Sequence, residues 1–253
     1  MKALIVNSGT GTRIGAEAAG HPKCMTPLTE EETIVSRQLR LLQEAGIDEV
    51  VMTTGLYAKK LEAYCRALSL SMKLTFVENP VFRSTNYIYS VYLAREYLEG
   101  ELLFLHGDLV WEEQVLYDLL QGEHAAARPA SAQPAPGSRV TVSSLQPVTE
   151  KDFKAILRAD GSIEKIGVPY VTDSIALQPL YKMDPQDWRI WCEAIEAFCR
   201  EGKTAVYAED AFNAVSDSCR ILPFDVEGML CAEVDDPDDH AIVKNRITFR
   251  TTD

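Results

Sequence analysis

The stretch that most constrains the fold of this chain lies at its start, in residues 2–23. Ala3 to Val6 are apolar and predict a buried parallel strand, and a turn rich in glycine follows at once. Small residues let backbone N–H groups close on a phosphate, because no Cβ blocks the approach. Arg13 adds a forked cation and Lys23 a point charge, and both suit phosphate oxygens. The stretch therefore predicts a phosphate-binding loop, with the candidate residues Ser8, Gly9, Thr10, Gly11, Thr12, Arg13 and Lys23.

Two common phosphate motifs fit this loop less well. The dinucleotide fingerprint Gly-x-Gly-x-x-Gly would need a glycine where Ile14 stands. The P-loop needs Gly-Lys-Ser/Thr, whereas Lys23 lies between Pro22 and Cys24. A lone Gly-x-Gly would suit an ordinary surface loop equally well. Arg13 and the Pro22-Lys23 pair, behind an N-terminal strand, favour a functional loop.

The composition excludes several classes of protein. The chain has 253 residues, which favours one large α/β domain over residues 1–253. It has no apolar run of transmembrane length and no signal segment, so we expect a cytoplasmic protein without membrane insertion. Its six cysteines are scattered without a Cys-x-x-Cys pair, which indicates a reduced protein without structural zinc. The net charge of −13 argues against a nucleic-acid partner.

Strands and helices alternate through the first half of the chain, which predicts a mostly parallel sheet flanked by helices. The expected strands there are residues 3–6, 50–54, 73–78 and 101–106, and the expected helices are 32–45, 59–68 and 86–98. Residues 121–138 are rich in alanine and proline and predict a mobile surface loop. After it we expect a strand at 139–144, a hairpin at 155–166, a strand at 175–180, helices at 187–200 and 207–216, strands at 221–224 and 230–234, and a last helix at 238–246.

Two aspartates follow apolar strands in this scheme. Asp108 ends the run LLFLHGD, and Asp235 ends the run LCAEVD. Ligands of parallel sheets bind at the carboxyl ends of the strands, so Asp108 should lie beside the glycine loop. Carboxylates there can hold Mg²⁺ together with phosphate oxygens. For Asp235 a helix-capping role is equally compatible with the sequence, and Asp236 suits the N-cap.

Two further segments could contact a ligand. Asn86 and Ser90 lie four residues apart and share a helix face that could meet a base, although Asn86 also suits an N-cap. Tyr207 and Glu209 could hold a substrate ammonium, or they could simply begin a solvated helix. His106 has no histidine or cysteine partner at metal spacing, so we interpret it as a structural residue at a strand end.

Taken together, these segments resemble the nucleotidyltransferase superfamily, and within it the bacterial cytidylyltransferases that activate phosphocholine or 2-aminoethylphosphonate. The resemblance covers nearly the whole chain. The loop alone also occurs in sugar-phosphate and cofactor nucleotidyltransferases. The motif TNYIYS followed by YAED is typical of a narrower group of enzymes. The carriers are NSGTGTR at 7–13, HPKC at 21–24, TNYIYSVYLA at 85–94, LHGDLV at 105–110, EKDFK at 150–154, LQPLYK at 177–182, YAEDAFN at 207–213 and AEVDDPDD at 232–239.

The resemblance implies a Rossmann-like fold of the GT-A type with a small hairpin-containing acceptor subregion. It implies Mg²⁺ as cofactor, CTP and a small zwitterionic phosphonate or phosphate as partners, and it leaves a homodimer open. It also implies a role for each candidate residue: Gly9, Gly11 and Arg13 on the triphosphate, Lys23 on the α-phosphate, Asp108 and Asp235 on Mg²⁺, Asn86 and Ser90 near the cytosine, and Lys154, Tyr207 and Glu209 on the acceptor.

The acceptor is less tightly constrained. The phosphocholine enzymes carry a tryptophan where Ala208 stands, and a thinner aromatic cage favours a primary ammonium, so we expect 2-aminoethylphosphonate rather than phosphocholine. A sugar-phosphate nucleotidyltransferase remains an alternative. A glycosyltransferase of related fold would be expected to carry Asp-x-Asp where His106-Gly107-Asp108 stands. A nucleotide-binding module without catalytic activity would be expected to lack Lys23 or Asp108, and both are present.

Overall fold

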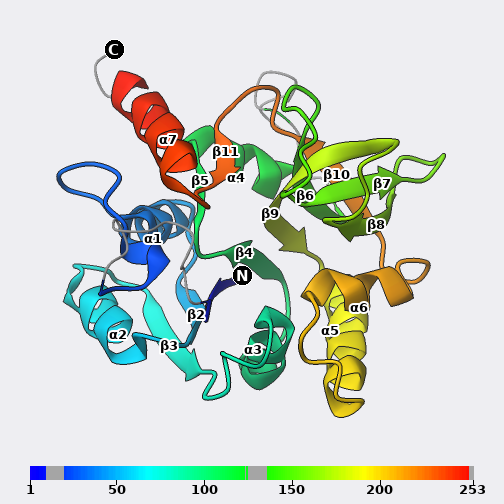
Figure 1. Cartoon of the computed structure of the whole chain (residues 1–253), viewed down its shortest axis with the longest axis horizontal. Coiled ribbons are helices and arrows are strands. Elements are labelled where there is room, and N and C mark those ends of the chain that lie inside the picture. The colour runs from blue at the N-terminus through cyan, green and yellow to red at the C-terminus, as the bar shows by residue number, and fades with distance from the viewer. Residues whose placement is uncertain (10–19, 123, 125–135, 251–253) are drawn as a thin grey trace.

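The computed structural model of the chain describes residues 1–9, 20–122, 124 and 136–250 (Figure 1). The predictions for Thr10, Gly11, Thr12 and Arg13 lie outside the described residues, as does most of the predicted loop at 121–138.

The described residues form a nine-stranded sheet with the order β10-β6-β9-β4-β1-β2-β3 and with β7 and β8 attached to β9. Strands β4, β1, β2 and β3 are parallel, as predicted, and β9 pairs antiparallel with β4. The strands are β1 (Lys2–Asn7), β2 (Glu49–Thr54), β3 (Lys73–Glu78), β4 (Leu102–His106), β6 (Ser138–Ser143), β7 (Lys154–Leu157), β8 (Ile163–Gly167), β9 (Ser174–Met183) and β10 (Ile221–Asp225).

Helices cover both faces of this sheet (Figure 1). Side chains alternate between the faces of a strand, so Leu4 packs with one group of helices and Ile5 with the other. The first group is α3 (Tyr87–Ala94), α5 (Pro185–Arg200) and α6 (Ala208–Val215), and the second is α1 (Ile34–Glu44), α2 (Ala58–Ala67) and α4 (Glu113–Gln121). Burial on both faces explains why the central strands β1 and β4 are continuous apolar runs.

Most of the predicted elements are confirmed to within a few residues. Helix α1 ends before Gly46, whose φ of +82° lies in the left-handed region that glycine adopts freely. Helix α3 is shorter than predicted, because a 3-10 turn at Arg95–Tyr97 replaces its last turn. Helix α4 was not predicted, although Val115, Leu116 and Leu119 are buried at helical spacing.

A small second sheet joins the segment after β4 to the C-terminal part of the chain. Strands β5 (Leu109–Trp111) and β11 (Cys231–Glu233) pair antiparallel, and α7 (Pro237–Arg250) follows them (Figure 1). Val110, Val234 and Val243 lie in one buried cluster that holds α7 against this sheet. The Val234 N–H also donates to Asp108 O at 3.0 Å, so the backbones before Asp235 and at Asp108 are bonded directly.

Within the described ranges, no helix is both long and apolar enough to cross a membrane.

Candidate active site

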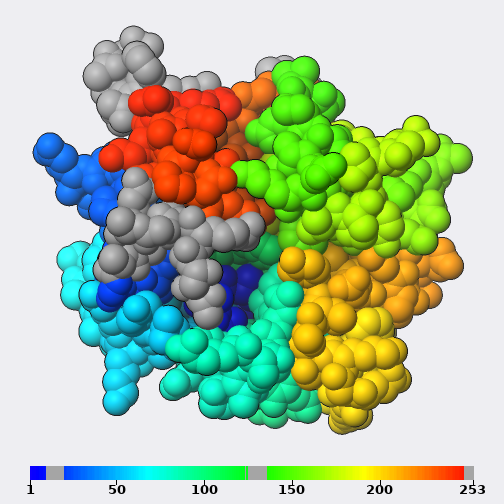
Figure 2. All heavy atoms as spheres, viewed as in Figure 1, coloured from blue at the N-terminus to red at the C-terminus, as the bar shows by residue number. Residues whose placement is uncertain are grey.

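A cavity of about 260 Å³ opens at the carboxyl ends of β1 and β4. Figure 2 shows a recess near the middle of one face, with atoms of the N-terminal strand in dark blue on its floor. The lining comes from segments far apart in the sequence and includes Ser8, Gly9, Asn86, Tyr87, His106, Asp108, Lys151, Phe153, Tyr207, Glu233 and Asp235.

Lys23 joins the two predicted metal ligands at this cavity. Its Nζ donates to Asp108 Oδ2 and to Asp235 Oδ1, at 2.6 Å each. Burial lowers the pKa of Lys23, but the two carboxylates outweigh it and raise that pKa above its usual value. For Asp108 burial acts in the opposite direction and raises the pKa. The charges of Lys23 and His106 outweigh this effect, so the pKa of Asp108 lies below its usual value. The site therefore holds an ammonium between two carboxylates.

The position of Asp108 depends on a glycine. All five residues of β4 are buried, and the chain turns sharply at Gly107 after the strand ends. A Cβ on residue 107 would collide with the side-chain amide of Asn7 at the end of β1. The Asn7 side chain at the end of β1 fills the space beside Gly107, so glycine lets the β4 turn approach β1 closely, with Asp108 beside Ser8 and Gly9.

Asp235 does not cap α7. Asp236 Oδ1 accepts from the backbone N–H groups of Asp238 and Asp239, at 3.0 Å each, so Asp236 fills the capping role. The Asp235 carboxylate reaches Lys23 instead. Asp108 Oδ1 is buried without a hydrogen-bond partner among the described residues. Two converging carboxylates, one with an oxygen to spare, fit the ligand set that Mg²⁺ prefers.

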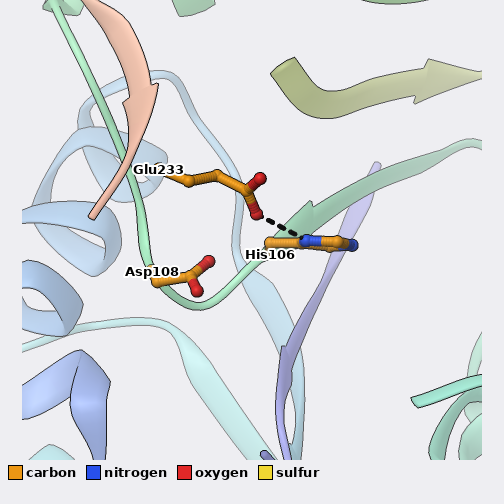
Figure 3. Close-up of side chains that lie close together, drawn as sticks. All are labelled: His106, Asp108 and Glu233. Carbon is orange, nitrogen blue, oxygen red and sulfur yellow. Dashed lines mark hydrogen bonds and ion pairs between the residues drawn. The ribbon is translucent and has the colours of Figure 1, made fainter. Parts of the chain in front are cut away.

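His106 and Glu233 form a second charged pair in the cavity. Figure 3 shows their side chains and that of Asp108 converging from β11, β4 and the turn after β4. His106 Nδ1 lies 2.8 Å from Glu233 Oε1. Burial lowers the pKa of His106, but Glu233 outweighs it and raises that pKa to about 9. Burial raises the pKa of Glu233 to about 7. His106 therefore lines the cavity as a charged group, a role that its interpretation as a structural residue missed.

The two residues predicted near the base occupy different places. Asn86 lines the cavity, and its side chain also caps α3 by accepting from the Tyr87 N–H at 2.7 Å. Ser90 is 1% exposed, and its Oγ shares a hydrogen bond of 2.6 Å with Ser8 Oγ. Asn79 Nδ2 donates to the same Ser90 oxygen at 3.0 Å. Ser90 therefore ties α3 to the start of the glycine turn and does not line the cavity.

The acceptor predictions are only partly supported by the geometry. Tyr207 lines the cavity and is 38% exposed. Glu209 is 1% exposed and accepts hydrogen bonds from the hydroxyls of Tyr87 and Tyr181, so it lies beneath the cavity wall. Lys154 is fully buried, and its Nζ donates to Thr149 O at 2.6 Å. The structure does not bring Glu209 or Lys154 to the cavity, because both are used to hold the fold.

Ala208 also differs from its prediction. It is fully buried, and its backbone carbonyl accepts from Trp191 Nε1 at 2.8 Å. The Ala208 side chain does not face the cavity, so it does not indicate how many aromatic rings surround a bound ammonium. A tryptophan at this position would overpack the core.

Sequence reasoning missed three further residues that line the cavity. They are Glu233, Phe153 and Lys151. The Phe153 and Tyr207 ring centroids lie 5.0 Å apart, and Tyr87 lies 5.8 Å from Tyr207. Lys151 pairs with Asp236 at 2.9 Å and with Asp239 at 3.0 Å. Lys151 and Phe153 belong to the segment EKDFK, one of the motifs on which the resemblance rests. The motif therefore indicated the correct segment, but the residues that line the cavity lie one and three positions before Lys154.

Several curated proteins are similar to this chain in sequence. The chain is 26% identical over 243 residues to a CMP-5'-(3-aminopropyl)phosphonate synthase of Streptomyces rubellomurinus, a match that covers 94% of this chain and 37% of that protein. It is 25% identical over 124 residues to a choline-phosphate cytidylyltransferase of Streptococcus pneumoniae, which covers 49% of this chain and 52% of the relative. The chain thus spans between about a third and about half of the length of these curated relatives.

Solved structures agree on the fold. A CTP:phosphocholine cytidylyltransferase of Streptococcus pneumoniae superposes with a TM-score of 0.74 at 18% identity, over 97% of this chain and 98% of that one. An inositol-1-phosphate CTP transferase of T. maritima gives 0.75 at 19% identity, over 98% of this chain and 96% of that one. The sequence model of the MobA-like NTP transferase domain matches residues 3–203. The chain therefore belongs to the MobA-like NTP transferase family.

Proposed function

We propose that this protein is a cytidylyltransferase that transfers CMP from CTP to a small aminophosphonate, best 2-aminoethylphosphonate, and releases pyrophosphate. The observation that carries the proposal is Lys23, whose ammonium lies between Asp108 and Asp235 at the edge of the cavity that Ser8 and Gly9 line. Carboxylates and a cation beside a glycine-rich turn are the groups that nucleotidyl transfer requires.

The reaction forms one bond and breaks one. An oxygen of the acceptor phosphonate attacks the α-phosphorus of CTP, and the bond from that phosphorus to the pyrophosphate oxygen breaks. Lys23 and Arg13 are the proposed catalytic cations, and Ser8 to Arg13 supply the proposed triphosphate contacts. Such transfer needs mainly positioning and charge neutralisation, so no covalent enzyme intermediate is required.

Asp108 and Asp235 would hold Mg²⁺ in this site. When bound, Mg²⁺ neutralises charge on the phosphate oxygens and orients them. The unpartnered Asp108 Oδ1 and the direct bond between the Asp108 and Val234 backbones support the assignment. Asn86 is the proposed contact to the cytosine. Ser90 is hydrogen-bonded to Ser8, so its proposed role is to support the triphosphate-binding turn.

The acceptor side of the cavity suits a zwitterion. Glu233 offers a carboxylate to an ammonium, and the rings of Tyr87, Phe153 and Tyr207 offer faces that attract a cation. Lys151 offers an ammonium to a phosphonate or phosphate. We therefore assign the acceptor ammonium to Glu233 and Tyr207, and the acceptor anion to Lys151.

The names of the relatives support this acceptor class. One is a CMP-5'-(3-aminopropyl)phosphonate synthase and another a choline-phosphate cytidylyltransferase. The match to the first covers more of this chain, which favours a phosphonate with a primary amine over phosphocholine.

A panel of substrates tests the proposal. The protein is incubated with CTP, UTP, ATP, GTP or dTTP and with 2-aminoethylphosphonate, phosphocholine or glucose 1-phosphate, while pyrophosphate release is followed and products are identified by ³¹P NMR. We expect the fastest release with CTP and 2-aminoethylphosphonate. Faster turnover of phosphocholine would replace the acceptor but keep the activity. Turnover of the sugar phosphate alone would favour a sugar-phosphate nucleotidyltransferase.

A further inference from the structure

A buried glutamine on α1 holds the turn that carries Asp108. Gln38 is 1% exposed. Its Nε2 donates to His106 O at 3.0 Å and to Leu109 O at 2.7 Å. These carbonyls belong to the last residue of β4 and the first residue of β5, so both hydrogens of one amide bracket Gly107 and Asp108.

The sequence context makes this amide unusual. The rest of the buried face of α1 is aliphatic, with Ile34, Val35, Leu39, Leu41 and Leu42. A polar side chain on such a face is unfavourable unless its hydrogen bonds are made. Gln38 Oε1 has no hydrogen-bond partner among the described residues, so the amide is only half satisfied. The part of the amide that is satisfied is therefore Nε2, which bonds the two carbonyls beside the Asp108 turn.

The turn is fixed on its other sides by backbone contacts. The Gly107 N–H donates to Val6 O at 3.1 Å, and Asp108 O accepts from the Val234 N–H at 3.0 Å. Gln38 supplies two further contacts, at His106 O and Leu109 O. Without it, α1 would keep its Arg37 bond to Trp111 O on β5, but the two carbonyls that bracket Gly107 and Asp108 would lose their hydrogen bonds to α1.

We propose that Gln38 is a positioning residue for nucleotidyl transfer, which holds the Asp108 turn so that Asp108 and Asp235 can share one divalent cation. The inference rests on the proposed function and adds to it a residue outside the cavity. Ligand-orienting residues behind a metal site typically change metal affinity or activity by about 10- to 100-fold when they are replaced.

The test compares two substitutions in the same helix. Gln38→Met keeps nearly the same volume but removes both donors. Gln43→Met is the matched control, because Gln43 Oε1 also makes two hydrogen bonds, to Ser71 N at 2.7 Å and Ser71 Oγ at 3.1 Å, on the outer part of α1. Gln38→Glu is a second variant. It keeps the shape of the side chain but replaces the donating Nε2 with a carboxylate oxygen, which faces the two carbonyls and cannot donate to them when ionised. Binding of Mn²⁺ to each full-length protein is measured by electron paramagnetic resonance, beside turnover and the melting temperature.

We expect both Gln38 variants to bind Mn²⁺ about tenfold or more weakly, with a similar fall in kcat and little change in the acceptor KM. Gln43→Met should bind Mn²⁺ as wild type does. A Gln38→Met protein that melts lower but binds Mn²⁺ normally would overturn the inference, because Gln38 would then serve stability alone. Failure of both variants to fold, or absence of Mn²⁺ binding by the wild type, would overturn it as well. Failure of the proposed function gives a different result, namely normal Mn²⁺ binding by wild type without turnover of any CTP and acceptor pair.

Discussion

Replacing Lys23 with methionine should change stability and catalysis together. In the structure the Lys23 ammonium is the shared partner of Asp108 and Asp235, and the side chains of the three residues are 14%, 22% and 12% exposed. Lys23→Met keeps the aliphatic stem and removes the charge. Two partly buried carboxylates would then face each other without the cation that now separates them.

The expected loss of stability follows from this burial. Breaking a fully buried ion pair by removing one partner costs about 3–5 kcal/mol, whereas exposed pairs contribute about 0–1 kcal/mol. These side chains keep some contact with water, so we expect Lys23→Met to lower the free energy of unfolding by roughly 2–3 kcal/mol at pH 7. By analogy with the loss of one preorganised donor, kcat should fall by about two to three powers of ten while CTP still binds.

The pH dependence gives this prediction its sign. The pKa of Asp108 is lowered in the folded wild type, so the stability that it contributes is present above the unfolded pKa, about 3.9, and is lost as the pH falls through the folded pKa. In Lys23→Met, burial acts on Asp108 without the lysine, and its folded pKa should rise. The difference between the two proteins should therefore be largest near neutral pH and should shrink as the pH falls toward 4 and below.

Urea denaturation between pH 4 and pH 8, with and without Mg²⁺, measures these effects. Mg²⁺ should stabilise Lys23→Met more than wild type, because it would supply the missing positive charge to Asp108 and Asp235. The reasoning would be refuted if wild type and Lys23→Met had the same free energy of unfolding at pH 7 as well as at pH 4. An unchanged kcat would remove Lys23 from the mechanism.

Two further predictions concern the carboxylates. Asp108→Asn and Asp235→Asn should abolish Mg²⁺-dependent turnover but keep the circular dichroism of the wild type, because both side chains lie at the cavity rather than in the apolar core; full turnover of Asp235→Asn at low Mg²⁺ would exclude that residue as a ligand. Glu233→Gln should lower kcat/KM for the acceptor by roughly 10- to 100-fold with little change in the KM for CTP, since it would remove a charge-assisted contact. Its matched control, Glu209→Gln, should instead lower the melting temperature and affect both substrates equally, because Glu209 is bonded to Tyr87 and Tyr181; acceptor KM values that change only in Glu209→Gln would reverse the assignment.

The parts of the site that sequence could predict are those fixed by local order. A buried strand followed by a glycine turn predicts where Ser8 and Gly9 lie, and the same reasoning applies to Asp108 after β4. Asp235 follows from the same pattern, although only the structure separates it from its neighbour Asp236, which caps α7. In each case the side chain is one or two residues from the end of a strand, so the sheet itself determines its position.

The residues that sequence missed depend on pairing between distant segments. Glu233 reaches His106 because β11 pairs with β5, and the local sequence around neither strand specifies that partner. Phe153 precedes β7, whose pairing with β9 is a long-range contact as well. Glu209 is a different case. It lies three residues before Phe212 on α6 and so shares its buried face, a periodicity that already argued against a solvated helix start.

The charges of the described cavity bear on the Mg²⁺ that we propose for this site. Asp108, Asp235 and Glu233 face the ammonium of Lys23 and the imidazolium of His106, while Lys151 is already paired with two carboxylates. These described cations are thus engaged by acidic side chains before any substrate arrives. A triphosphate adds several negative charges, and bringing them beside the same carboxylates would raise the local repulsion steeply in a partly buried site. The two aspartates that now hold Lys23 are the groups able to bind a divalent cation, and binding one would release the Lys23 ammonium toward the α-phosphate. Under the proposed mechanism, Lys23 lies between Asp108 and Asp235 in the resting site, at the position proposed for Mg²⁺.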